Sequence, residues 1–196
     1  MYKRQVLNTA NVSAGDTVVV FGAGGVGLNA VSGARIAGAS RIVVIDIQAK
    51  RLDEARRFGA SDVIDSTKTK PVEAVRDLLP GGADHVFDFV GQKSVAELGL
   101  AMLGVGGGLY LVGVANPDVE ISMNIFNAIG GQKRVQGVNF GSTNAKHDIP
   151  MYAELYLQGR MNLDDLVSRR ISLRDVNDGY AALKDGSLTR VVVTSF

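Results

Sequence analysis

The amino-acid sequence predicts an α/β protein built on a doubly wound, mainly parallel sheet of the Rossmann type. Short β-branched apolar runs alternate with segments of helical periodicity, the pattern of successive βαβ units. Glycine-rich turns such as Pro80-Gly81-Gly82 and Gly106-Gly107-Gly108 separate these segments. The predicted strands cover residues 17–21, 41–46, 62–64, 84–89, 109–114 and 134–139, and the predicted helices cover 26–38, 49–58, 71–79 and 94–103.

The remainder of the chain is less regular. Asn116-Pro117-Asp118 interrupts the pattern, and residues 119–123 then predict a short extra strand. Helices are expected at 146–159 and 173–184, with a closing strand at 190–193.

The connection between the first strand and the first helix carries a specific motif. Residues 22–27 read Gly-Ala-Gly-Gly-Val-Gly, which is Gly-x-Gly-x-x-Gly between a predicted strand and a predicted helix. Gly22 permits a sharp turn, Gly24 lets a pyrophosphate approach the backbone, and Gly27 lets the helix pack tightly on the strand. Free N–H groups and the helix dipole favour phosphate at this helix start. The motif, including Gly25 and Val26, therefore predicts a dinucleotide site.

Asp46 closes the second predicted strand, where a carboxylate would accept hydrogen bonds from both adenosine ribose hydroxyls. A 2′-phosphate at that point would meet like-charge repulsion of about 4 kcal/mol at 4 Å and an effective dielectric near 20. We therefore expect NAD rather than NADP, although the guanidinium of Arg51 could partly offset a phosphate. In the alternative interpretation, Asp46 and Arg51 only solvate a strand end.

Composition restricts the other function classes. The chain has 196 residues, of which 46% are hydrophobic, enough for a full core. Its net charge of +1 is spread without a polybasic face, so neither nucleic acid nor a membrane surface is an expected partner. No apolar run approaches the length of a membrane span, and the absence of cysteine excludes disulfides and thiolate zinc sites in these residues. We expect a cytoplasmic protein.

Residues suited to acid–base or metal chemistry are scarce. The only histidines are His85, inside a predicted strand, and His147, at the start of a surface helix, and both are interpreted as structural or solvated. Asp164-Asp165 resembles a helix start. Tyr180 and Lys184 have the Tyr-x-x-x-Lys spacing of short-chain dehydrogenases, but they lie too far downstream for that role. The sequence therefore predicts a cofactor domain with no catalytic or metal-binding residue of its own.

Several segments resemble the zinc-type medium-chain alcohol dehydrogenases, nearest to the class III and related bacterial branch. They are residues 16–28, 33–39, 55–60, 156–160 and 188–193, together with Asp46. The resemblance implies a subunit whose N-terminal GroES-like domain holds zinc through Cys and His, so zinc is expected only in the full-length protein. It also implies that residues 1–15 are a truncated lead-in from that missing domain, 16–145 a Rossmann domain, and 146–196 closing helices and a strand.

The resemblance also assigns roles to individual positions. It places Val26 at the pyrophosphate turn, Asp46 and Arg51 at the adenosine ribose, Val90, Val112 and Val114 at the nicotinamide, the backbone of Phe140 at the carboxamide, and Arg190 at the pyrophosphate. It further implies a homodimer or homotetramer formed through the strand around 119–125. The alternative there is an exposed edge strand, which is an aggregation hazard.

The leading hypothesis is the NAD-binding domain of a zinc-dependent alcohol dehydrogenase, which moves hydride from an alcohol to NAD and is inactive as this isolated chain. One alternative is a non-catalytic nucleotide-binding or dimerisation module. The other is a zinc-free quinone-reductase-like relative, a group that usually prefers NADP and against which Asp46 argues. The substrate stays open among primary alcohols, polyols and S-hydroxymethyl thiol adducts.

Overall fold

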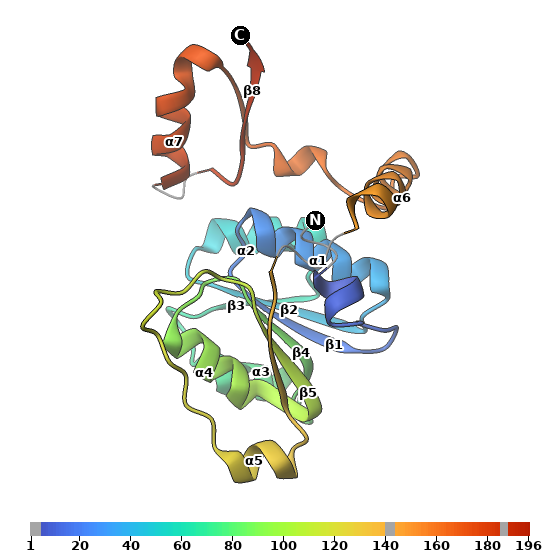
Figure 1. Ribbon diagram of the computed structural model, residues 1–196, viewed down its shortest axis with the longest axis vertical. Helices are drawn as coiled ribbons and strands as arrows, with labels where there is room; N and C mark the ends of the chain where they lie inside the picture. Colours follow the sequence, from blue (N-terminus) through green and yellow to red (C-terminus); the bar gives the residue numbers. More distant parts are fainter. Residues whose placement is uncertain (1–4, 140–143, 185–187) are drawn as a thin grey trace. The chain divides into compact units, whose positions relative to one another are not determined.

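The computed structural model describes residues 5–139, 144–184 and 188–196. The chain divides into two compact units, Met1–Asp148 and Ile149–Phe196. The first is built on a six-stranded sheet of order β3-β2-β1-β4-β5-β6, in which every neighbouring pair is parallel (Figure 1). The predicted doubly wound parallel sheet is thereby confirmed.

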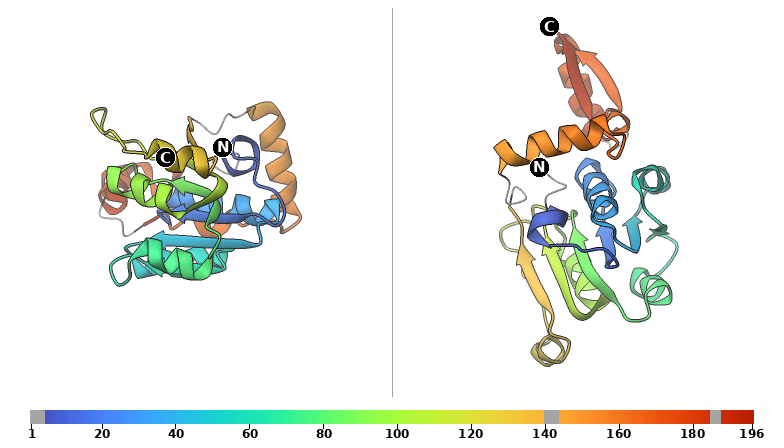
Figure 2. Two further views of the ribbon diagram at one scale, coloured as in Figure 1. Left: turned by 90° about the horizontal axis from the view of Figure 1, so that it is seen from below. Right: turned by 90° about the vertical axis from the view of Figure 1, so that its right-hand side faces the viewer.

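The elements of this unit follow the predicted alternation closely. The strands are β1 (Thr17–Phe21), β2 (Arg41–Asp46), β3 (Asp62–Asp65), β4 (Ala83–Asp88), β5 (Leu103–Leu111) and β6 (Arg134–Gly137). The helices are α1 (Gly25–Ala37), α2 (Ala49–Phe58), α3 (Pro71–Leu78), α4 (Lys93–Met102) and α5 (Ile125–Gly130), after an opening π-helical turn at Gln5–Thr9. α1 packs beside α2 on one face of the sheet, and α3 packs beside α4 on the other (Figure 2).

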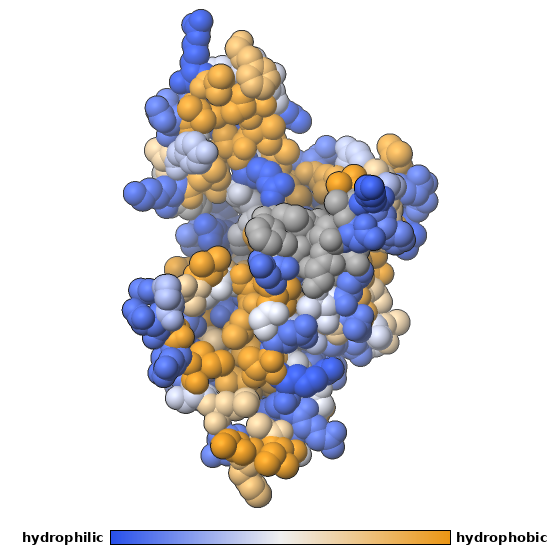
Figure 3. All heavy atoms as spheres, viewed as in Figure 1, coloured by the Kyte–Doolittle hydropathy of each residue, from blue (hydrophilic) through white to orange (hydrophobic). Residues whose placement is uncertain are grey.

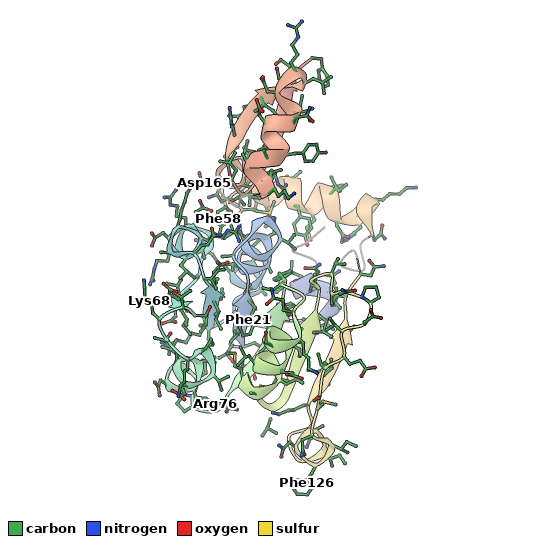
Figure 4. All side chains as sticks on the ribbon, turned by 90° about the vertical axis from the view of Figure 1, so that its left-hand side faces the viewer. Phe21, Phe58, Lys68, Arg76, Phe126 and Asp165 are labelled. Carbon is green, nitrogen blue, oxygen red and sulfur yellow. The ribbon has the colours of Figure 1, made fainter. Side chains whose placement is uncertain are left out.

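The core lies between the sheet and these helices. Val18, Val19 and Val20 of β1 are fully buried, because both faces of a doubly wound sheet are covered. Figure 4 places Phe21, the last residue of β1, in the interior of the unit. Burying each such side chain contributes about 1.5–3 kcal/mol, so the central strands form a rigid base for the loops at their carboxyl ends.

One predicted strand is absent, and another begins earlier than predicted. Residues 119–123 form no strand, and the short helix α5, which the sequence did not predict, follows them. A strand requires a neighbour for its backbone N–H and C=O groups, and β5 is already paired on both sides by β4 and β6. β5 also begins at Leu103 rather than 109, because its glycine-rich start pairs with β4 through a register shift between Ala83 and His85 instead of forming a turn.

The second unit holds a two-stranded parallel sheet of β7 (Arg169–Ser172) and β8 (Val191–Ser195). The helix α6 (Ala145–Leu157) begins before this unit and continues into it, and α7 (Val176–Lys184) follows β7. Short 3-10 turns stand at Asp164–Leu166 and Leu173–Asp175. Both predicted helices are present, whereas β7 escaped prediction because it is short and begins with two arginines. None of the helices in the described ranges is both long and apolar enough to span a bilayer.

Candidate functional site

A cavity of about 420 Å³ opens at the carboxyl ends of β1, β2, β3 and β4. It is lined by Phe21, Gly22, Gly24, Gly25, Val26, Gly27, Ile45, Asp46, Ile47, Arg51, Ser66, Pro71, Phe89, Val90, Gln92, Val95 and Leu98. Eight of the predicted site residues are among them: the five motif positions Gly22 and 24–27, together with Asp46, Arg51 and Val90. The structure thus brings these eight residues, which lie at or after the ends of β1, β2 and β4, to one concave surface, where α/β sheets bind ligands.

The glycine loop leaves room where a phosphate would lie. Gly22 has φ of +90°, a left-handed conformation that favours glycine. A Cβ at Gly27 would collide with the carbonyl oxygen of Gly22, so only glycine allows α1 to start this close to the strand. A Cβ at Gly24, by contrast, would meet no atom within 4 Å. That open space faces a helix whose N-cap, Gly24, has no side chain to satisfy the first N–H groups.

Asp46 does more than the sequence predicted. Its Oδ2 accepts a 2.7 Å hydrogen bond from the N–H of Ala23, and its Oδ1 accepts a 2.9 Å bond from the N–H of Gln48. The Nη1 of Arg51 lies 4.0 Å from Oδ2, and the Asp46 side chain is only 4% exposed. The carboxylate therefore holds the glycine loop through the N–H of Ala23. Each of its oxygens can still accept a hydrogen bond from a further donor, such as a ribose hydroxyl.

The end of β4 contributes a second carboxylate, Asp88, which the sequence analysis did not select. It is 2% exposed, and its Oδ1 accepts hydrogen bonds from the N–H groups of Val90 at 2.8 Å and Gly91 at 3.1 Å. Burial raises the pKa of the Asp88 carboxyl, and the two N–H donors offset part of that rise. Its position as the last residue of a strand, where α/β sheets bind ligands, is the signal that could have found it.

The other four predicted positions are Val112, Val114, Phe140 and Arg190. Val112 and Val114 follow β5 and are not among the residues that line the cavity, and Val114 is 97% exposed. Phe140 lies outside the described residues. Arg190 belongs to the second unit, where its N–H donates to the Oγ of Ser168 at 3.2 Å. The roles of these four residues stay predictions.

Several lining residues were missed by sequence reasoning. Ile47 and Ser66 directly follow β2 and β3, so the rule that ligands bind beyond strand carboxyl ends could have found them. Val95 and Leu98 come from α4 and Pro71 from the start of α3. No local pattern marks those three, because only the packing of α3 and α4 against the sheet brings them to the cavity.

His85 has a structural environment near the amino end of β4, away from the cavity at the carboxyl ends. It is buried in β4, with Nε2 3.0 Å from the Oδ2 of Asp16 and Nδ1 3.3 Å from the hydroxyl of Tyr110. His147 lies on the exposed start of α6, 3.2 Å from the Oδ1 of Asp148. Among the described residues no three His, Asp or Glu side chains come together as a metal-binding group, and the sequence has no cysteine. These residues do not fit the zinc that the resemblance implies for the full-length protein.

Comparison with known proteins decides the family. A family model described as zinc-binding dehydrogenase matches residues 25–158. The chain belongs to this family. The resemblance to zinc-type alcohol dehydrogenases is therefore confirmed.

The relatives extend well beyond this chain. A probable S-(hydroxymethyl)glutathione dehydrogenase 1 of Schizosaccharomyces pombe is 36% identical over 190 residues, covering 96% of this chain and 50% of that protein. The crystal structure of an alcohol dehydrogenase zinc-binding domain protein from Burkholderia ambifaria matches with a TM-score of 0.96 and 30% identity, covering 100% of this chain and 52% of that one. This zinc-binding dehydrogenase chain thus spans about half the length of the relatives it matches.

One structural relative was solved with a nucleotide. A putative zinc-binding dehydrogenase from Sinorhizobium meliloti, bound to NADP, matches with a TM-score of 0.83 and 27% identity over 90% of this chain and 52% of that one. The choice between NAD and NADP in this zinc-binding dehydrogenase chain must therefore be argued from its own residues.

Proposed function

We propose that this chain is the NAD-binding part of a zinc-dependent alcohol dehydrogenase. The observation that carries the proposal is the arrangement of Asp46 directly beneath an open glycine loop within a single cavity. The free space at Gly24 suits the pyrophosphate, the first turn of α1 supplies N–H donors, and Asp46 suits the adenosine ribose. When bound, NAD supplies the hydride acceptor, and the residues of this chain hold and orient it.

We infer NAD rather than NADP from the surroundings of Asp46. The carboxylate is nearly buried and already accepts two backbone N–H groups, so it cannot swing away from an added 2′-phosphate. The Asp46 carboxylate would then repel a 2′-phosphate with the energy estimated above. Arg51, whose Nη1 lies 4.0 Å from the same carboxylate, is already engaged there and is less available to offset the phosphate charge. The S. meliloti relative was solved with NADP, so the preference is specific to this site rather than to the family.

Calorimetric titration of the 196-residue chain with NAD, NADP and 5′-AMP tests both steps. We expect NAD to bind at least tenfold more tightly than NADP, because a repulsion of about 1.4 kcal/mol already corresponds to that ratio. If the chain bound none of the three nucleotides, the proposed site would be contradicted. If NADP bound more tightly than NAD, the proposed role of Asp46 would be contradicted.

Alcohol oxidation belongs to the proposal for the complete subunit. The described residues provide no metal-ligand group, so we propose that the purified chain alone does not turn over alcohols. Alcohol-dependent NADH formation by this chain, free of contaminating enzyme, would contradict this. The name of the S. pombe relative makes an S-hydroxymethyl thiol adduct a substrate candidate beside primary alcohols and polyols.

We also propose that two copies of the chain pair through the region around 119–125. Residues 119–124 form no helix or strand, and Ile125, Phe126 and Ile129 of the following helix are exposed. Figure 3 shows an apolar patch over α5, and Figure 4 shows Phe126 pointing away from the sheet. A partner copy would cover these side chains and supply the neighbouring strand that residues 119–123 lack.

A further inference from the structure

Asp88 connects the loops that follow two neighbouring strands. Its carboxylate accepts the N–H groups of Val90 and Gly91, as described above. Its backbone carbonyl accepts the N–H groups of Val112 and Gly113, each at 2.9 Å. One residue thus satisfies four backbone donors, two from the loop after β4 and two from the loop after β5.

The two loops touch so closely that neither can shift alone. Gly91 has φ of +77°, and a Cβ there would lie 2.9 Å from the backbone carbon of Gly113. A Cβ on Gly113 would collide in turn with the backbone nitrogen of Gly91. Because no side chain separates the loops, the Asp88 carboxylate, which holds the loop after β4, also limits where the loop after β5 can lie.

This arrangement fixes a residue of the nucleotide cavity. Val90 lines the cavity, and its Cγ2 is 3.2 Å from the position that a Cβ on Gly22 would occupy. Its backbone N–H is one of the two held by the Asp88 carboxylate. The carboxylate itself is not among the residues that line the cavity, so any effect it has on a bound nucleotide passes through the loop.

We propose that Asp88 is a positioning residue, which holds the loops after β4 and β5 in their binding geometry before the nucleotide arrives. This inference rests on the proposed nucleotide-binding function. A buried carboxylate is costly, and its desolvation is offset here by charge-assisted hydrogen bonds that remove loop freedom. Loops that are already ordered lose less entropy on binding, so preorganisation contributes to affinity.

The first test compares variants of the two carboxylates of β4 in calorimetric titrations with NAD. Asp88→Ala should weaken NAD binding about tenfold or more, since it leaves two partly buried N–H groups without their acceptor. Asp88→Asn should bind within about threefold of the wild type, because the amide oxygen can still accept both N–H groups. Asp84→Ala is the matched control: Asp84 accepts two hydrogen bonds from Thr17 at the other end of the strand, and its loss should leave NAD affinity unchanged.

A double-mutant cycle with Val90→Ala separates positioning from general destabilisation. If Asp88 acts through the loop that carries Val90, then Asp88→Ala should cost less than about threefold in the Val90→Ala background. Full additivity of the two losses, or an equal loss of NAD affinity in Asp84→Ala, would overturn the proposal.

A measurement on the wild-type chain needs no variant and covers the case in which Asp88→Ala fails to fold. Amide hydrogen exchange at Val90 and Gly91 should be slow without nucleotide and change little when NAD is added. Fast exchange that becomes slow only with NAD would overturn the proposal. Should the wild type bind no NAD at all, the proposed function fails, while the exchange rates still decide whether the loops are preordered.

Discussion

At the scale of single residues, the site depends on a few side chains and on glycines, which leave space because they have no side chain. Asp46 was predicted to bind the adenosine ribose, and in the structure it also holds the glycine loop, because the N–H groups of Ala23 and Gln48 donate to its two oxygens. Gly24 and Gly27 belong to one motif but have opposite surroundings, open space at the first and a backbone carbonyl at the second. Motif identity therefore does not by itself say which glycine serves the ligand and which serves the fold.

Asp46→Asn should weaken NAD binding about tenfold and reduce the preference for NAD over NADP. The amide places an N–H donor against either the Ala23 or the Gln48 N–H, which costs about 1–3 kcal/mol, and it removes the charge that repels a 2′-phosphate. Calorimetric titration with both nucleotides measures the two effects. The same substitution at exposed Asp53 of α2 is the control and should alter neither. An unchanged NAD:NADP ratio in Asp46→Asn would contradict the assignment of Asp46 to the ribose.

Gly24→Ala and Gly27→Ala should separate binding from stability. Gly24 has φ of −74°, so alanine is tolerated and the melting temperature should hold, while the added methyl group occupies the phosphate space and weakens NAD binding. Gly27→Ala should destabilise the fold by about 1–3 kcal/mol or more, because its Cβ meets the Gly22 carbonyl. Thermal unfolding and NAD titration of both variants give the answer. Equal melting temperatures in the two variants would count against this division of roles.

At the scale of elements, strand ends are held by short polar contacts rather than by the core alone. Thr17 of β1 donates its N–H and its hydroxyl to Asp84 of β4, at 2.8 and 2.7 Å. Arg41 of β2 binds both oxygens of Asp62 of β3 and also donates to the carbonyl of Leu78 at the end of α3. Such contacts fix the amino ends of the strands, at the end of the sheet opposite the cavity, so they stabilise the sheet without touching the loops that line the cavity.

The turn after β3 should make part of the stability acid-sensitive. The Oδ2 of Asp65 pairs with Lys68 at 2.8 Å, and its Oδ1 accepts the N–H and hydroxyl of Thr67. Hydrogen bonds from Lys68 and Thr67 lower the pKa of Asp65 from 3.8 to about 2. Since the folded pKa is depressed, the contribution is fully present above about pH 4 and is lost as the pH falls through about 2.

Asp65→Asn should therefore be less stable than the wild type above about pH 4, and the difference should shrink steadily toward pH 2. Urea unfolding of both proteins at a series of pH values measures this. Asp53→Asn, an exposed change of the same kind, should show no such narrowing. A difference in the free energy of unfolding between wild type and Asp65→Asn that stays constant with pH would contradict the proposed contribution of Asp65 to acid sensitivity.

At the scale of the whole molecule, the surface around α5, beside the edge strand β6, carries exposed apolar side chains. β6 is the edge strand of the six-stranded sheet, and the segment that precedes it carries exposed apolar side chains on α5. Contiguous apolar surface of this kind usually marks an interaction site. The cavity is lined by none of these residues, so assembly and nucleotide binding can be tested independently.

Phe126→Ser should shift the chain from dimer to monomer while leaving NAD affinity unchanged. Phe126 is 83% exposed in the single chain, so its replacement removes apolar area from the proposed interface without opening the core. Sedimentation velocity over a range of protein concentrations measures the change. Leu157→Ser, which alters another exposed apolar residue on α6, is the control and should remain dimeric. A wild type that is monomeric at every concentration would contradict the proposed pairing.

The sequence by itself determined the strand–loop–helix unit of residues 17–37 and the place of Asp46, since turn chemistry and strand length are local properties. Only the tertiary structure decided that Asp46 braces the loop, that Val90 enters the cavity while Val112 and Val114 do not line it, and that Asp88 holds two loops at once. It also decided that residues 119–123 form no strand. Those outcomes depend on which neighbour is available to accept a hydrogen bond or share a surface, and that choice is made by contacts between segments far apart in the chain.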